Sequence, residues 1–163
     1  MKTLVAGIGN IFFGDDGFGV EVARRLGVAD YGIRGIHLAY DLLDGYDALV
    51  LIDALPMGEP PGTVCLFEPD IDGLEPAPAV EGHSMSPAVV LGLLRSLGGE
   101  VPQVLIVGCE PLSVAEGMGL SAPVAAAVEP AVEVVRRVVA DLHSGQPGQT
   151  GHEQPGHQEV LAG

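Results

Sequence analysis

The sequence is short of tryptophan, cysteine and basic residues, and these shortages exclude several kinds of protein. Tryptophan is absent, and only seven basic residues stand against 22 acidic ones, for a formal net charge of −15. Such a charge repels phosphate backbones and anionic lipid surfaces, so we expect no nucleic-acid partner. The two cysteines, Cys65 and Cys109, form no C-x-x-C pattern and lie in apolar segments. We expect both to be small core residues, in a reducing compartment.

Long apolar runs are also missing. Asp53, Arg95 and Glu129 interrupt the best candidates before they reach the ~18 to 20 residues that a membrane helix needs. The apolar start behind Lys2 lacks a small-residue cleavage site, so we expect mature sequence rather than a signal peptide. These features predict a soluble, cytoplasmic protein without membrane insertion, and 163 residues suffice for one domain with its own core.

Strand and helix patterns alternate along most of the chain, which predicts an α/β fold. The expected fold is a single-domain α/β/α sandwich with a mostly parallel, about five-stranded twisted sheet. Expected strands are Thr3–Ala6, Val28–Tyr31, Ala48–Ile52, Thr63–Phe67 and Val104–Val107; expected helices run over residues 18–26, 36–45, 87–97 and 121–142.

Three stretches depart from this alternation. Pro130 lies inside the last helical pattern and predicts a kink. The proline-rich, acidic stretch Glu68–Gly82 predicts an exposed loop. The polar tract from Ser144 onward cannot offset its ordering entropy, so the domain should cover residues 1–143 and residues 144–163 should be a disordered tail.

The stretch Gly7–Gly19 holds five glycines, Asn10 and the adjacent aspartates Asp15 and Asp16, directly behind an apolar run. Packing alone does not require this composition. Glycines let the backbone adopt left-handed angles and let another molecule approach closely. Ligands bind at the carboxyl ends of parallel strands, so this loop should share one edge of the sheet with the Gly32–Gly35 turn, with Asp53 and with the segment 108–111.

Two chemistries fit glycines and acids at such an edge. A dinucleotide site would begin with G-x-G, but Phe12 stands where the third glycine is needed and two aspartates occupy the phosphate loop. A divalent metal site could use Asp16, Asp53 and His83, whose carboxylates and imidazole suit a borderline ion. Structural roles for the same residues, as helix cap, strand-end acid and loop histidine, remain open from spacing alone. Asp15 suits a purely capping role.

The pattern G-I-G-N-x-x-x-G-D-D-G-x-G at Gly7–Gly19 resembles the signature of the [NiFe]-hydrogenase maturation proteases. The resemblance continues through V-L-I-D-A at Asp53, G-H-S at His83, G-x-E-P at residues 108–111 and G-x-x-L-S at residues 117–121, and covers residues 2–142. It implies an endopeptidase that removes a C-terminal peptide from the nickel-loaded precursor of a hydrogenase large subunit.

The resemblance further implies that Asp16, Asp53 and His83 contact nickel, supplied by the precursor, and serve in catalysis. The glycine loop and its neighbour turn would bind substrate through Gly7, Gly9, Asn10, Gly32 and Gly35. Hydrolysis through a metal-polarised carbonyl and an aspartic-type mechanism both stay open. The alternative from a different class is a non-catalytic, metal-sensing chaperone or binding module on the same fold.

Overall fold

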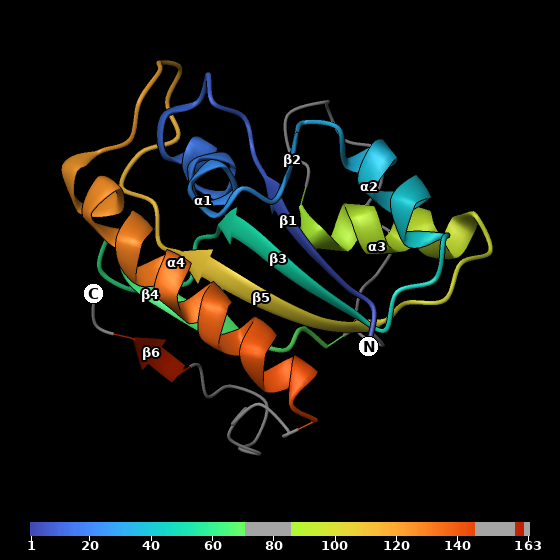
Figure 1. Ribbon diagram of the computed structural model, residues 1–163. Coiled ribbons are helices and arrows are strands. Elements are labelled where there is room, and N and C mark those ends of the chain that lie inside the picture. The colour runs from blue at the N-terminus through green and yellow to red at the C-terminus, as the bar shows by residue number, and fades with distance from the viewer. Residues whose placement is uncertain (71–85, 146–158, 162–163) are drawn as a thin grey trace.

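The protein is built around one six-stranded sheet, as a computed structural model shows for residues 1–70, 86–145 and 159–161 (Figure 1). The strand order is β2-β1-β3-β5-β4-β6. The strands are β1 (Thr3–Ile8), β2 (Ala29–Gly32), β3 (Ala48–Ala54), β4 (Val64–Phe67), β5 (Gln103–Cys109) and β6 (Glu159–Leu161). Strands β2, β1, β3 and β5 are parallel, whereas β4 runs antiparallel to both β5 and β6. The mostly parallel α/β fold expected from the sequence is confirmed.

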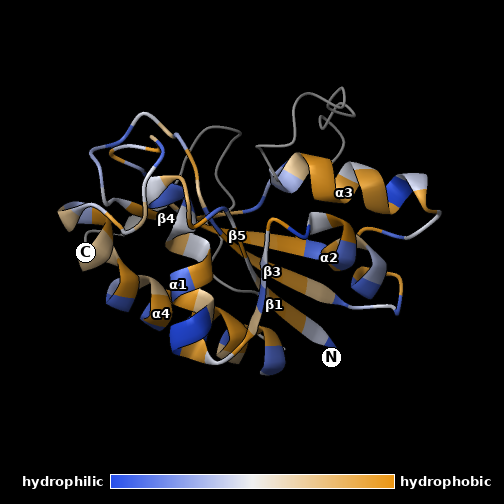
Figure 2. Cartoon of the chain, turned by 90° about the horizontal axis from the view of Figure 1, so that it is seen from above, coloured by the Kyte–Doolittle hydropathy of each residue, from blue (hydrophilic) through white to orange (hydrophobic). Residues whose placement is uncertain are grey.

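Two pairs of helices cover the sheet, one pair on each face (Figure 2). The helices are α1 (Phe18–Leu26), α2 (Gly35–Leu42), α3 (Pro87–Ser96) and α4 (Ala122–His143), preceded by the short 3₁₀ helix η1 (Gly14–Gly17). Helices α1 and α4 pack on Val50 and Ile52 of β3, while α2 and α3 pack on the alternate residues Leu49 and Leu51. All seven residues of β3 are therefore buried, as expected for a central strand covered on both faces.

Local signals set the element ends much as the sequence predicts. Ser86 is the N-cap of α3, where its Oγ accepts the N–H of Val89 at 3.3 Å, and Pro87 follows at the first helical position. Helix α4 continues past Pro130, and the kink expected there stays a prediction. Both cysteines are buried core residues, and burial raises the pKa of both thiols, that of Cys109 to about 12.

The tail differs from its predicted disorder in one stretch. Strand β6 lies within residues 144–163 and pairs antiparallel with β4, with Val160 opposite Cys65. Its backbone completes the edge that β4 would otherwise leave open. Most of the predicted loop Glu68–Gly82 lies outside the described residues, as do residues 146–158 and 162–163 of the tail. Among the described helices, none combines the length and the apolar composition needed to cross a membrane.

Helix α1 lies very close to the sheet because Gly19 has no side chain. A Cβ at this position would lie 2.2 Å from the carbonyl oxygen of Ile52 and 2.4 Å from that of Ile8. Gly7 faces the same contact, since its Cβ would lie 2.1 Å from the carbonyl oxygen of Gly19. These two glycines fix how near the start of α1, and the acids just before it, come to the ends of β1 and β3.

Candidate functional site

The carboxyl ends of the four parallel strands meet at one edge of the sheet, as the sequence predicts. The loop after β1 lies there beside the segment 111–121, which follows β5, at the top of Figure 1. Backbone hydrogen bonds join the two: the N–H of Gly14 donates to the carbonyl of Gly117 at 2.8 Å, and the N–H of Gly117 to that of Phe12 at 2.8 Å. The loop that carries Asp16 is therefore held by a partner about a hundred residues away in the chain.

Asp53 is a buried carboxylate at the end of the central strand. It is the penultimate residue of β3 and only 4% exposed. Burial raises the pKa of Asp53 well above its usual range, and the negative charge of nearby Asp16 raises it further. The hydrogen bond from the N–H of Ala54 lowers this pKa and so offsets part of the rise. The structure gives Asp53 no cationic partner among the described residues. The raised pKa means that Asp53 loses its proton less readily than an exposed carboxyl group does.

Asp16 is the second acid of the site and is only partly buried. Its Oδ2 accepts the backbone N–H of Asn10 at 2.8 Å, which fixes the carboxylate against the loop. Burial raises the pKa of Asp16, and this hydrogen bond partly offsets the effect. Asp16 and Asp53 therefore act on each other electrostatically, and such a pair can bind a cation or share a proton and orient a water molecule.

Gly9 allows this arrangement of Asp16. Its φ of +137° lies outside the range that side chains favour, and a Cβ would lie 1.9 Å from the carbonyl oxygen of Asp16. The side chain of Asn10 meanwhile accepts the N–H of Phe12 at 2.9 Å, closing a local turn. The glycine and the asparagine of the sequence pattern thus shape the loop around Asp16.

Asp15 has the opposite role from its neighbour. It is 1% exposed, and its carboxylate accepts four hydrogen bonds at 2.7 to 3.1 Å, from the N–H groups of Leu112, Ser113 and Ser121 and the hydroxyl of Ser121. Burial raises the pKa of Asp15, but these bonds outweigh burial and lower it below the ordinary value. The predicted capping role needs correction, because Asp15 binds the segment after β5 rather than the start of its own helix.

The third predicted ligand, His83, lies outside the described residues. Within the described part of the chain, no three histidine, cysteine or acidic side chains are grouped so as to hold a metal ion. Asp16 and Asp53 are brought together by the structure, whereas the place of His83 stays a prediction. Glu110 of the G-x-E-P segment accepts the N–H of Met57, a structural contact that sequence reasoning did not assign.

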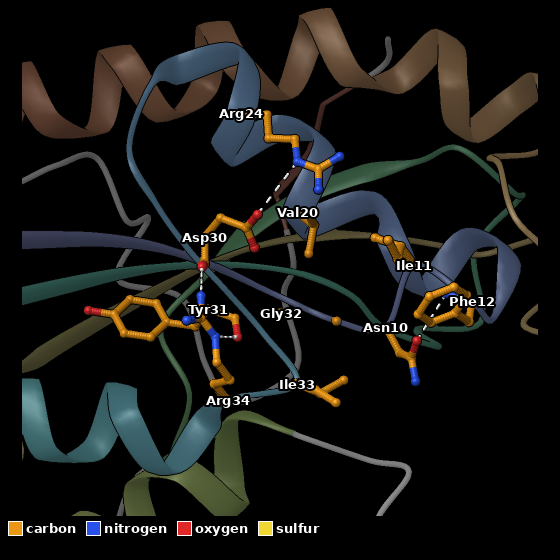
Figure 3. Close-up of a pocket in the computed structure, with 11 residues that line it drawn as sticks. Asn10, Ile11, Phe12, Val20, Arg24, Asp30, Tyr31, Gly32, Ile33 and Arg34 are labelled. Atoms are coloured by element: carbon orange, nitrogen blue, oxygen red, sulfur yellow. Dashed lines mark hydrogen bonds and ion pairs between the residues drawn. The ribbon is translucent and has the colours of Figure 1, made fainter.

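A pocket of about 350 Å³ opens beside Asp16, between the loops that follow β1 and β2 (Figure 3). Of the predicted substrate-binding residues, Gly9, Asn10 and Gly32 line it. Gly7 packs under α1 and Gly35 begins α2, and neither lines the pocket. The remaining lining residues, which sequence reasoning missed, are Ile11, Phe12, Val20, Arg24, Asp30, Tyr31, Ile33 and Arg34. The sequence signal that could have found some of them is the presence of large apolar residues, such as Phe12 and Ile33, in predicted loops.

Comparisons with known proteins agree on one family. Residues 20–138 match the family model HycI, described as hydrogenase maturation protease. The chain is 30% identical over 150 residues to the hydrogenase expression/formation protein HupD of Rhizobium leguminosarum bv. viciae, covering 85% of this chain and 74% of that protein. A protein of Methanocaldococcus jannaschii that is named as a putative hydrogenase maturation protease is 31% identical over 147 residues, covering 81% of this chain and 92% of that protein.

Solved structures are similar over nearly the same span. The hydrogenase maturating endopeptidase HybD of E. coli superimposes with a TM-score of 0.68 at 30% identity, covering 89% of this chain and 94% of HybD. The hydrogenase 2 maturation peptidase of a Thaumarchaeota archaeon gives a TM-score of 0.63 at 29% identity, covering 85% of this chain and 98% of the peptidase.

Proposed function

The chain belongs to the hydrogenase maturation protease family, and from this premise we propose that it removes a C-terminal peptide from the nickel-loaded precursor of a hydrogenase large subunit. As a member of this family it is an endopeptidase that acts in hydrogenase maturation. The observation that carries the finer proposal is the pair formed by buried Asp53 and half-buried Asp16 at the open edge of the sheet.

Nickel held by the precursor would be the cation that this acid pair lacks. Burial and mutual repulsion favour uncharged forms of the two acids, so an arriving divalent cation would stabilise both carboxylates and release protons. Because the precursor supplies most of the ligands, two carboxylates are sufficient for recognition, with His83 proposed as a third contact. Cleavage would thereby depend on the metal having been inserted.

The chemistry proposed is addition of water to the scissile carbonyl carbon, followed by breakage of the carbon–nitrogen bond. Asp16 is the more accessible acid, and its carboxylate would take the proton of the attacking water. That proton would then pass to the departing amine. Nickel would polarise the carbonyl if it acts in catalysis, whereas an aspartic-type route needs only the two acids. Cleavage of the nickel-free precursor would favour the aspartic-type route.

The test is to incubate the purified protein with nickel-loaded precursor and weigh the products by mass spectrometry. We expect the wild-type protein to release the C-terminal peptide, and Asp16→Asn, Asp53→Asn and His83→Ala each to reduce processing at least a hundredfold. Asp44→Asn, a change at an exposed aspartate away from the site, is the matched control and should process normally. A precursor that stays intact with the wild-type protein, but binds it, would instead support the non-catalytic chaperone.

A further inference from the structure

The pocket adjoins Asp16 through the backbone of Asn10, although Asp16 itself does not line it. Gly9 and Asn10 line it, and the backbone N–H of Asn10 is the group bound to Asp16 Oδ2 at 2.8 Å. One residue of extended peptide spans roughly 3.3 Å. A substrate side chain that enters the pocket would therefore belong to a residue within about two positions of the bond that is cleaved with the help of Asp16.

The walls of the pocket are mainly apolar and come from three elements. Ile11 and Phe12 belong to the loop after β1, Val20 to α1, and Ile33 to the turn after β2 (Figure 3). Phe12 is 58% exposed and Ile33 60% exposed, although both are large and apolar. Exposed apolar side chains around a concave space are typical of sites that bury part of a ligand.

The charges at the edge of the pocket are already engaged. Arg24 Nε lies 3.5 Å from Asp30 Oδ2, and Arg34 donates to the carbonyl oxygens of Asp30 at 2.8 Å and Tyr31 at 3.3 Å. Asp30 is the only acid among the residues that line the pocket. A basic side chain would thus meet two arginines and no unpaired carboxylate among the described lining residues. An apolar side chain would enter without giving up hydrogen bonds to water.

Two of the lining residues, Gly9 and Gly32, are joined through their backbones. The N–H of Gly9 donates to the carbonyl of Gly32 at 3.0 Å, which joins the two loops. Arg34 bonds the end of β2 from the other side. A pocket that is formed before the substrate arrives costs less ordering entropy on binding, and it can select for the size of a side chain.

We propose that this pocket is a specificity subsite that binds one large apolar side chain of the precursor, within about two positions of the cleaved bond. The inference rests on the proposed function, because it assigns this substrate to the same edge of the sheet. The apolar walls favour an aliphatic or aromatic side chain at that position, and the two arginines beside a single aspartate disfavour a basic one.

The experiment measures processing of the nickel-loaded precursor by the full-length protein and by Ile33→Asp. Ile33 is exposed, so an aspartate there should leave the fold intact while placing a charge on the apolar wall. We expect KM to rise at least tenfold with kcat within about twofold, since the change removes substrate binding and leaves the acids in place. Ile36→Asp is the matched control, because Ile36 is 48% exposed on α2 and does not line the pocket.

The partner side chain is found by replacing each precursor residue near the cleaved bond with alanine. Alanine at one apolar precursor position should raise the KM of the wild-type protein. The same alanine should add little to the raised KM of Ile33→Asp, because both changes remove the same contact. Additive effects at every position, or equal KM values for Ile33→Asp and Ile36→Asp, overturn the subsite while wild-type processing still supports the proposed function. A precursor left intact by the wild-type protein overturns both.

Discussion

Asp15 and Asp16 are adjacent in the chain, yet their carboxylates meet opposite environments. Asp15 is saturated by four hydrogen bonds from the segment 112–121, and its pKa is lowered. Asp16 keeps one bond, from Asn10, and its pKa is raised. A carboxylate whose lone pairs are all used by hydrogen bonds within the protein stabilises the fold. A carboxylate with few such bonds can still accept bonds from a ligand. Asp15 therefore has a structural role, and Asp16 is the acid that the proposed function assigns to the chemistry.

Asp53 should lower the stability of the folded protein at neutral pH. The folded pKa lies above the unfolded value near 3.8, so the folded state binds more protons across that window. The free energy of unfolding contributed by this group is therefore highest below about pH 4 and falls as the pH rises through the folded pKa. Asp53→Asn removes the buried carboxylate, and we expect its Tm to exceed the wild-type Tm by a few degrees at pH 8 but not at pH 3.5.

Thermal unfolding of both proteins at the two pH values checks this expectation. Asp44→Asn, at an exposed site, controls for the loss of one negative charge from an acidic protein. A Tm for Asp53→Asn that is below wild type at pH 8 would contradict the burial argument. Loss of processing together with a raised Tm would separate a functional role for Asp53 from a structural one.

At the level of elements, the site depends on how closely α1 approaches the ends of β1 and β3. Helix α1 follows η1 directly, so any shift of the helix also shifts Asp16. The approach is set by Gly19, whose Cα lies against the carbonyls of Ile8 and Ile52. Gly7 and Gly19 of this pattern therefore serve helix packing.

Gly19→Ala should push α1 away from the sheet. We expect a loss of about 2–4 kcal/mol in the free energy of unfolding, because the added methyl group would meet rigid backbone atoms. Processing should fall more than stability alone explains, since Asp16 moves with the helix. Urea unfolding and the processing assay test both parts. Gly108→Ala is the matched control, because a Cβ there meets side-chain atoms at ordinary distances of 3.4 to 3.6 Å.

In the whole molecule, the site and the tail lie on different strands of the sheet. The acids lie at the carboxyl ends of β1 and β3, whereas β6 pairs with β4, beyond β5. Strand β6 adds one short antiparallel pairing at that edge. An unpaired edge strand is prone to pair with strands of other chains, so the pairing with β6 protects the edge of β4 from such association.

Truncation after Gly145 should leave processing within about twofold of the full-length protein. We expect a loss of about 1 kcal/mol or less in stability, because three residues of strand pairing contribute little net free energy. The exposed edge of β4 should also make the truncated protein more prone to self-association, which light scattering would detect. Loss of processing at unchanged stability would show that the tail takes part in substrate binding.

The sequence by itself determined the fold class, the order of strands and helices up to α4, and the loop that carries the candidate site. Continuous apolar runs such as Ala48–Ile52 predicted buried strands, and alternation with helices predicted a mostly parallel sheet whose carboxyl ends meet. The glycine-rich stretch, with its two adjacent aspartates, marked the loop of the candidate site. These signals are local in the chain, and so they could be found without the structure.

Only the tertiary structure decided what each acid and each loop residue does. Asp15 binds groups 97 to 106 residues away, and no local pattern reveals such partners. The burial of Asp53 beside Asp16, and the pocket between the loops after β1 and β2, likewise arise where distant segments meet. Burial and long-range hydrogen bonding depend on the packed sheet and helices, which is why two neighbouring aspartates that look alike in the sequence have opposite roles in the folded protein.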